Sequence, residues 1–372
     1  MQIAKMQIAK IDVFGLAMTN AHGTFELSGG RALDAADSTL VRITTDTGLE
    51  GWGESCPLTG AYLPAFTGGI RAALDEIAPT LIGVDPRNLA AVTARMDGAL
   101  RGQAAAKCPL DVACWDILGR STGLPIATLL GGLVTDDLPL YEAIPIGTVE
   151  ETEERVNASL ARGFRRFQLK VGGDPRADVV AVRRVVDLAG AGALIIVDAN
   201  GGWRLDDALV AARGLADLPV YFEQPCSTLE ACARVQRVTG LPMIYDEVVV
   251  DAESLVAAVR DGGASVVNLK LTKVGGLTRL RALRDLAASL GVRVMLEDTW
   301  GGDIASAAIS HVAASAPAGA LLATTFVNDA TREHVAGHQP RSANGQGNVP
   351  AGVGLGIDVG LDLLGAPIAT YA

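Results

Sequence analysis

The fold is decided by a pattern that is clearest in RRFQLKVGG (residues 165–173) and ALIIVDAN (residues 193–200). Each stretch is a short apolar run that carries a charged side chain near its end, Lys170 in the first and Asp198 in the second. Runs that are apolar almost throughout are typical of parallel strands buried on both faces. The residues between them have the spacing of an amphipathic helix, so the pair predicts one β-α-β unit.

The same pattern recurs along the second half of the chain. The strand candidates are, in order, LPLYEAI, RRFQLKV, ALIIVDAN, PVYFEQP, PMIYDEV, SVVNLKL, RVMLED and ALLATTF. Amphipathic stretches such as LTRLRALRDLAASLG (277–291) separate them. Eight such units predict an α/β fold, a (β/α)8-type TIM barrel in residues 136–326 that allows for a trimmed last helix.

The remainder of the chain predicts a second domain beside the barrel. Residues 6–52 alternate between apolar and polar side chains, and helical spacing dominates from about residue 70 to residue 131. These patterns predict an α+β capping domain in residues 6–135, with loops at 20–37 and 55–69 that help to select the substrate. Residues 327–372 are expected to pack back on this domain. Residues 1–5 repeat the next five, MQIAK, and are expected to carry no structural weight.

Composition limits the classes of partner. The 372 residues are 49% hydrophobic and 20% charged, as in a compact globular protein. A net charge of −11 disfavours nucleic acid and anionic membranes as partners. The five cysteines form no Cys-x-x-Cys pair, which predicts reduced thiols and a cytoplasmic location. No signal-peptide pattern and no membrane-spanning apolar run are visible, so a small-molecule ligand is expected.

Acidic residues end three consecutive strands of the predicted barrel. The third, fourth and fifth strands end in Asp198, Glu223 and Asp246. Active sites of such barrels lie at the C-terminal ends of the strands, so these carboxylates should crowd one rim. Like charges at that distance repel unless a cation lies among them. Three carboxylates without a nearby His or Cys favour a hard ion, and the sequence predicts a Mg²⁺ site.

Lysines flank the acidic strand ends on both sides. Lys170 ends the second strand and Lys270 lies on the sixth, so the two are expected to face each other across the ion. A divalent cation and a partly dry pocket destabilise an ammonium group, which should lower the lysine pKa and allow it to act as a base. The expected chemistry is removal of the proton α to a carboxylate through an ene-diolate, whose charge the ion stabilises. Lys273 is expected to support the site rather than act as the base.

The motifs QLKVG, VDAN, FEQP, YDE and NLKLTKVGG resemble the mandelate racemase and muconate lactonizing enzyme branch of the enolase superfamily, and the resemblance extends over essentially the whole chain. It implies one Mg²⁺ held by the acidic trio, with Lys170 and Lys270 as the acid/base pair. Many members have Lys-x-Lys at the end of the second strand, whereas here Gln168 takes the first position. Gln168 is expected to contact the substrate, but how the substrate carboxylate is held stays open. The resemblance also implies supporting roles for Asn200 and Glu247 and a homo-oligomer.

The substrate prediction rests on the pocket rim. Glu297, Asp298 and Trp300 follow the seventh strand, and Tyr62 comes from a capping loop. Acidic and aromatic side chains together favour a cationic or zwitterionic ligand. Within the family the rim resembles enzymes of proline-type amino acids, and racemisation or 2-epimerisation of such an amino acid or its betaine, as in hydroxyproline betaine or proline betaine, is the first expectation.

Other activities remain open from the sequence. Dehydration of cis-3-hydroxy-L-proline is the alternative, because the second lysine can also protonate a leaving hydroxyl. An acid-sugar dehydratase is expected less, since no strand ends in His. A non-catalytic carboxylate-binding barrel is the competing class, and it predicts ligand binding without α-proton exchange.

Overall fold

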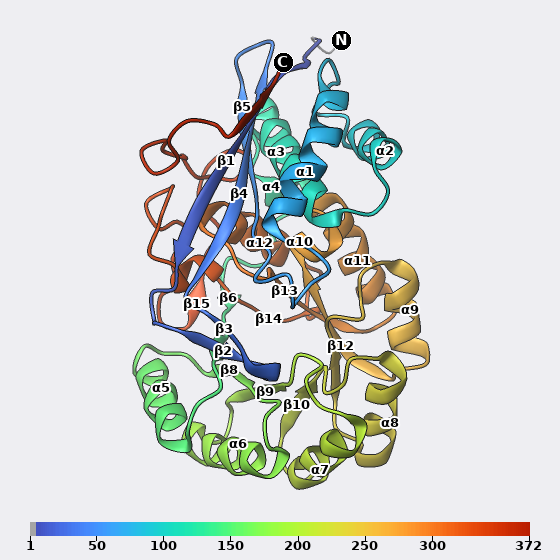
Figure 1. Cartoon of the computed structure of the whole chain (residues 1–372), viewed down its shortest axis with the longest axis vertical. Coiled ribbons are helices and arrows are strands. Elements are labelled where there is room, and N and C mark those ends of the chain that lie inside the picture. The colour runs from blue at the N-terminus through green and yellow to red at the C-terminus, as the bar shows by residue number, and fades with distance from the viewer. Residues whose placement is uncertain (1–4) are drawn as a thin grey trace.

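The computed structural model describes residues 5–372, so most of the first MQIAK copy lies outside the described residues. The chain forms a capping domain, which contains both ends of the described range, and a barrel beneath it (Figure 1). The boundaries expected at residues 135 and 326 stay predictions.

The capping domain is built on an antiparallel sheet with the strand order β16-β1-β4-β5. Its strands are β1 (Ile8–Thr19), β4 (Ala35–Thr45), β5 (Glu50–Ser55) and β16 (Ala369–Tyr371). The last strand joins the first, with Ile11 opposite Tyr371, so the end of the chain lies on the capping sheet.

Helices cover one face of this sheet. They are α1 (Thr67–Ile77), η2 (Ala78–Leu81), α2 (Leu89–Ala99), α3 (Ala104–Thr122) and α4 (Ile126–Leu129). Helix α3 lies directly against β5, and the GWG motif explains how it can. A Cβ atom at Gly53 would lie 1.9 Å from the Pro109 carbonyl oxygen, and one at Gly51 would lie 2.3 Å from that of Ala113. Only glycine permits this approach.

The barrel consists of parallel strands in the unbroken order β7 to β14. They are β7 (Glu142–Ile144), β8 (Arg166–Lys170), β9 (Leu194–Asp198), β10 (Val220–Glu223), β11 (Met243–Tyr245), β12 (Ala264–Lys270), β13 (Arg293–Glu297) and β14 (Leu321–Thr324). A parallel bridge between Leu140 and Thr324 closes the ring, and the Tyr141 N–H donates to the Thr324 carbonyl at 2.9 Å.

Helices surround the barrel on the outside (Figure 1). They are α5 (Val149–Ala161), α6 (Pro175–Ala189), α7 (Leu205–Leu215), α8 (Leu229–Thr239), α9 (Ala252–Arg260), α10 (Leu271–Val274), α11 (Leu277–Ser289) and α12 (Asp303–Ala314). Only the short turn η3 (Val327–Ala330) follows β14 where an eighth helix is usual. The predicted barrel with a trimmed last helix is therefore confirmed.

Two carboxylates of the capping domain cap barrel helices. Glu54 on β5 accepts the N–H groups of Gly302 and Ala305 at the start of α12, at 2.8 and 3.0 Å. Asp111 on α3 accepts the N–H of Thr278 at the start of α11, at 3.0 Å. A negative charge at a helix N-terminus satisfies free N–H groups and the helix dipole. These contacts hold the capping domain over the C-terminal ends of the barrel strands.

Residues 20–37 were predicted as a loop, and the structure corrects this. They contain a small hairpin of β2 (Phe25–Leu27), η1 (Ser28–Gly30) and β3 (Arg31–Leu33). The two remaining strands, β6 (Leu138–Pro139) and β15 (Gln346–Gly347), pair with each other. Across the described range 5–372, no helix is both long and apolar enough to cross a membrane.

Candidate active site

The acidic trio lies on three adjacent strand ends. Asp198 ends β9 and Glu223 ends β10, directly opposite each other in register, and Asp246 follows β11. All three side chains are fully buried. The structure therefore brings together the three residues that the sequence singled out.

The crowding of the carboxylates shifts their pKa values. Burial, together with the charges of Asp198 and Asp246, raises the pKa of Glu223 to about 8. Burial also opposes ionisation of Asp246, but Lys270 and Lys273 outweigh it and hold the pKa of that carboxyl below its usual range. Three buried carboxylates in one place thus need positive charge to remain ionised together.

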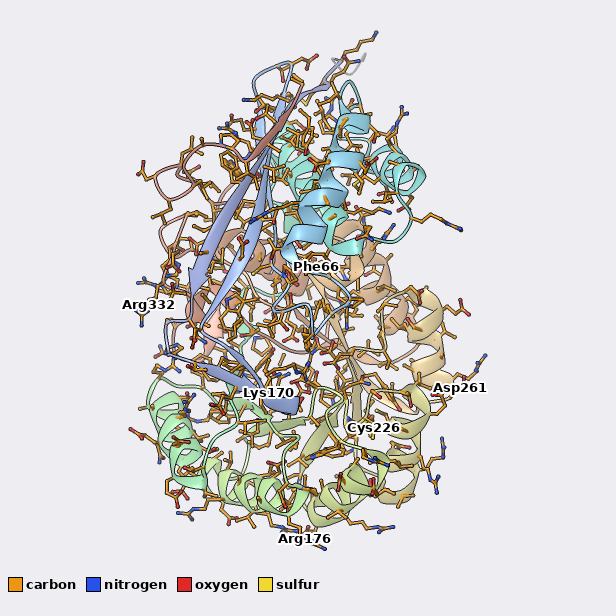
Figure 2. All side chains as sticks on the ribbon, in the orientation of Figure 1. Phe66, Lys170, Arg176, Cys226, Asp261 and Arg332 are labelled. Carbon is orange, nitrogen blue, oxygen red and sulfur yellow. The ribbon has the colours of Figure 1, made fainter. Side chains whose placement is uncertain are left out.

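The two predicted lysines approach the trio from opposite sides. Strands β8 and β12 flank the acidic strands β9 to β11 in the barrel order. The Lys170 Nζ contacts Asp198 Oδ2 at 2.6 Å, and the Lys270 Nζ contacts Asp246 Oδ2 at 2.6 Å. Figure 2 shows Lys170 in the interior, where the hairpin of the capping domain meets the barrel, whereas Arg176 lies on the outer edge. The side chains therefore stand on two sides of the carboxylates.

The fall in pKa expected for Lys270 beside a bound ion stays a prediction, and the protein's own groups act on that pKa in two opposing directions. Burial lowers its pKa, but the charges of Asp246, Glu247 and Glu223 outweigh burial and raise it above the ordinary value. Lys273 behaves in the opposite way: burial outweighs the attraction of Asp246 and lowers its pKa. The carboxylates thus stabilise the ammonium of the proposed base, whereas the sequence argument had considered only the opposing effects of an ion and a partly dry pocket.

A polar layer lies directly below the trio in the barrel. Gln168 donates from Nε2 to Glu223 Oε2 at 2.8 Å, so its amide is engaged with a carboxylate of the trio. Asn268 donates from Nδ2 to both Glu223 Oε1 and Glu297 Oε1, at 2.7 and 2.8 Å. Glu297 also contacts the Lys270 Nζ at 3.1 Å. These contacts fix the orientation of Glu223.

The donor set fits a hard cation. In residues 5–372, no group of three or more His, Cys, Asp or Glu side chains has the geometry to hold a metal ion as it stands. The available donors are carboxylate and amide oxygens, which Mg²⁺ prefers. Asn200 donates to Asp198 Oδ2 at 2.9 Å and to Glu247 Oε1 at 3.1 Å. Asn200 Oδ1 and Glu247 Oε2 are buried without a hydrogen-bond partner among the described residues. Such buried acceptors are satisfied by a cation or by water bound to one.

A cavity of about 640 Å³ opens between the trio and the capping domain. Lys170, Lys270 and Asn200 line its floor, and Phe25, Leu27, Leu58 and Tyr62 belong to its capping wall.

Tyr62 reaches from the capping loop down to the acidic trio. Its hydroxyl donates to Asp246 Oδ2 at 3.0 Å and accepts a hydrogen bond from the Lys270 ammonium. The Lys270 Nζ also lies 4.8 Å from the Tyr62 ring centroid. Burial, followed by the charges of Asp246 and Glu247, raises the pKa of Tyr62 well above its ordinary value.

The residues after β13 have two different surroundings. Trp300 lines the cavity and packs edge-on against Phe25, with ring centroids 5.9 Å apart. Asp298 is buried and accepts the N–H and hydroxyl of Thr272 at 2.9 and 2.8 Å and the N–H of Thr299 at 2.8 Å. Burial nevertheless raises its pKa to about 7. In this arrangement Asp298 holds the backbone that carries Trp300.

Sequence reasoning missed Asn268, Phe25 and Glu54. Asn268 had a usable signal: it lies two residues before Lys270 in an apolar strand, so it must point to the same face. Glu54 is the only charged residue in the GWGES motif, yet its partner lies 248 residues away in the chain. No local signal marks Phe25.

Comparison with known families covers most of the chain. Residues 14–131 match the N-terminal domain of mandelate racemase and muconate lactonizing enzyme, and residues 151–363 match the family described as enolase C-terminal domain-like.

Individual relatives match most of the length of this chain. The chain is 41% identical over 367 residues to a cis-3-hydroxy-L-proline dehydratase of Roseibium aggregatum, which spans 99% of this chain and 100% of the relative. It is 28% identical over 314 residues to an N-succinyl-L-Arg/Lys racemase of Bacillus cereus, with 83% and 85% covered.

Solved structures agree with this result. A mandelate racemase/muconate lactonizing enzyme from Roseovarius nubinhibens ISM superposes with a TM-score of 0.95 at 36% identity, covering 99% of both chains. Another from the same organism, complexed with magnesium, gives a TM-score of 0.94 at 34% identity, covering 98% of this chain and 100% of the other. The chain therefore belongs to the mandelate racemase/muconate lactonizing enzyme family of the enolase superfamily, and it is an enzyme of the isomerase or lyase type.

Proposed function

We propose that this enzyme removes the proton α to the carboxylate of a proline-type amino acid, and that its reaction is the dehydration of cis-3-hydroxy-L-proline. The observation that carries this proposal is the placement of Lys170 and Lys270 on opposite sides of the acidic trio. The 41% identical relative, named as a dehydratase of this amino acid, supports the choice of dehydration over the epimerisation expected first from the sequence.

The stereochemistry of the substrate agrees with opposed lysines. In the cis isomer the 3-hydroxyl is on the same ring face as the carboxylate, so the α-hydrogen and the hydroxyl are on opposite faces. One lysine can take the α-proton while the other gives a proton to the leaving hydroxyl. The Cα–H and C3–O bonds break, a Cα=C3 double bond forms, and water leaves. The resulting cyclic enamine tautomerises to the cyclic imine.

Other residues of the chain hold the groups that surround the two lysines during these steps. We assign one Mg²⁺ per chain to Asp198, Glu223 and Asp246. When bound, it supplies positive charge that stabilises the negative charge developing on the substrate carboxylate. Asn200 and Lys273 hold the carboxylates, with the Lys273 Nζ 2.6 Å from Asp246 Oδ1, and Glu247 in turn accepts a hydrogen bond from Asn200. Tyr62 and the capping hairpin cover the floor of the cavity and limit access of water.

A second candidate is 2-epimerisation of a proline-type amino acid or its betaine. The same opposed lysines favour it, because one can remove the α-proton and the other can return a proton on the other face. Tyr62 and Trp300 offer aromatic surfaces to an alkylated ammonium. The leaving group decides between the two: only a substrate with a 3-hydroxyl can be dehydrated.

The test is incubation with Mg²⁺ in D₂O, followed by NMR. Dehydratase activity predicts loss of cis-3-hydroxy-L-proline with formation of the cyclic imine, and little turnover of the trans isomer, whose α-hydrogen and hydroxyl are on one face. Deuterium at Cα of both stereoisomers of proline betaine, without dehydration, would favour the epimerase. Binding of these ligands with no exchange would leave a non-catalytic binding protein.

Variants test the residue roles. Lys170→Ala and Lys270→Ala should each lower turnover by about 10²- to 10⁴-fold, in the range of a lost general acid or base. Lys5→Ala changes an exposed lysine and should have no effect. Normal turnover in both site variants would overturn the assignment. The cytoplasmic location and the homo-oligomeric state remain predictions.

A further inference from the structure

We propose that Arg31, which does not line the cavity, is the positioning residue that locks the capping wall over the active site and holds Tyr62 against Lys270 and Asp246. The kinetic part of the argument rests on the proposed function, whereas the structural part does not.

Arg31 joins three segments that are far apart in sequence. Its Nε donates to the Ser28 carbonyl at 2.8 Å and its Nη2 to the Ser28 hydroxyl at 2.6 Å, within the hairpin. Nη2 also donates to the Asn200 carbonyl of the barrel at 3.3 Å, and Nη1 to the Ala61 carbonyl of the capping loop at 3.3 Å. The guanidinium carbon lies 5.8 Å from the ring centroid of Tyr62. One side chain thus ties the hairpin, the capping loop and the end of a catalytic strand together.

The hairpin tip is built to dock at this place. Ser28 is buried, and it lies against two glycines that follow catalytic strands of the barrel. A Cβ atom at Gly172 would lie 2.5 Å from the Ser28 Cβ, and one at Gly202 would lie 2.6 Å from it. The glycines after Lys170 and after Asn200 therefore leave space for the tip, and Figure 1 shows the hairpin lying over β8 and β9.

Arg31 is connected to the reacting groups through Tyr62. The hairpin supplies Phe25 and Leu27 to the cavity, and the capping loop supplies Leu58 and Tyr62. Arg31 connects both segments to the barrel through its hydrogen bonds to Ser28, Ala61 and Asn200. Because the Tyr62 hydroxyl bonds to Asp246 and Lys270, displacement of the capping loop would move a hydrogen-bond partner of Lys270, one member of the proposed acid/base pair.

An arginine is required for this arrangement. The carbonyls of Ser28, Asn200 and Ala61 and the Ser28 hydroxyl are four acceptors at one planar group. A guanidinium presents five N–H donors in a fixed plane, whereas a lysine presents three donors from one point. Lysine would keep the charge but cannot reach all three segments.

The structural test measures hydrogen exchange by mass spectrometry on the full chain with Mg²⁺. Arg31→Lys and Arg31→Met should increase exchange in the peptides that cover residues 24–33 and 58–66, and leave the barrel helices unchanged. The control is Arg176→Met, which alters an exposed arginine at the outer edge of the molecule (Figure 2). Exchange in both Arg31 variants equal to that of the control would overturn the proposal, whatever the enzyme's substrate is.

The kinetic test is a double-mutant cycle with Tyr62→Phe. We expect each single variant to lower kcat/KM for cis-3-hydroxy-L-proline about 10- to 100-fold, and the double variant to be no worse than the poorer single variant by more than about threefold, because Arg31 acts through Tyr62. Multiplied effects would show that Arg31 does not act through Tyr62 and would overturn the proposal. Absence of turnover in the unmodified enzyme, with the exchange result as expected, would reject the substrate and retain the role of Arg31.

Discussion

Acidification is expected to destabilise the protein through His311. This residue lies in α12, fully buried, and joins three segments. Its Nδ1 accepts the N–H of Ala127 in α4 at 3.2 Å, and its Nε2 lies 3.0 Å from the Leu355 carbonyl in the C-terminal segment. The neutral imidazole with its proton on Nε2 satisfies both partners. A second proton on Nδ1 would face the N–H of Ala127 and break that bond.

The magnitude follows from the pKa. Burial lowers the pKa of His311 from 6.5 to about 4, against the opposing effect of the Leu355 carbonyl. At about 1.4 kcal/mol per pKa unit, this difference amounts to about 3 kcal/mol of folding free energy. Because the unfolded chain takes up the proton first, the contribution is present above pH 6.5 and is lost as the pH falls toward 4. By pH 5 the expected loss is about 2 kcal/mol.

The assay is urea unfolding followed by circular dichroism at pH 7 and pH 5. His311→Gln keeps a donor and an acceptor but does not titrate, so its free energy of unfolding should fall by about 2 kcal/mol less than that of the unmodified protein between these pH values. His22→Gln, at an exposed histidine, is the control and should retain the full fall. An equal fall in His311→Gln and the unmodified protein would refute the reasoning.

Three further predictions concern other buried contacts. Burial raises the pKa of Asp111 to about 6 despite the hydrogen bonds that it accepts, so stability should decrease by about 2 kcal/mol as the pH rises from 4 to 6, and Asp111→Asn should remove this slope in thermal unfolding curves. Lys273→Met removes the buried ammonium that contacts Asp246 and should lower the free energy of unfolding by about 3–5 kcal/mol, measured by urea unfolding. A decrease below about 1 kcal/mol would contradict the contact between these two side chains. Gly202→Ala places a methyl group against Ser28 and should displace the hairpin, lowering kcat/KM about tenfold. Adding Ser28→Gly should restore part of the loss, and no restoration would show that the clash lies elsewhere.

The barrel and the acidic trio could be read from local sequence patterns. An apolar run identifies a buried strand, and the residue that ends it must lie at the C-terminal rim of a parallel barrel. The strand ends Asp198, Glu223 and Lys170 are therefore placed by their position in the chain alone, and Lys170, Asp198 and Glu223 do stand side by side in the sheet register. The same reasoning could have found Asn268, since side chains two residues apart in a strand share a face.

The environment of these residues could not be read in this way. The sequence argument considered the effect of an ion and a partly dry pocket on the pKa of Lys270. That pKa also depends on how many carboxylates surround the ammonium, and the carboxylates of the folded site act to raise it. Asp298 was expected at the substrate; in the structure it lines the cavity and also bonds to Thr272 and to the backbone of Thr299, contacts that the sequence did not indicate. Position along a strand determines which rim a side chain reaches, and the neighbouring segments determine what it contacts there.

The sequence by itself determined the type of fold, the order of the strands and the side chains at their ends, because strand periodicity and strand termination are local properties of the chain. Only the tertiary structure decided how the capping domain closes over those side chains. Arg31 contacts Asn200 across 169 residues, and Glu54 reaches α12 across 248. Such contacts depend on the docking of two domains, and no pattern of neighbouring residues encodes which distant carbonyl or helix end a side chain will meet.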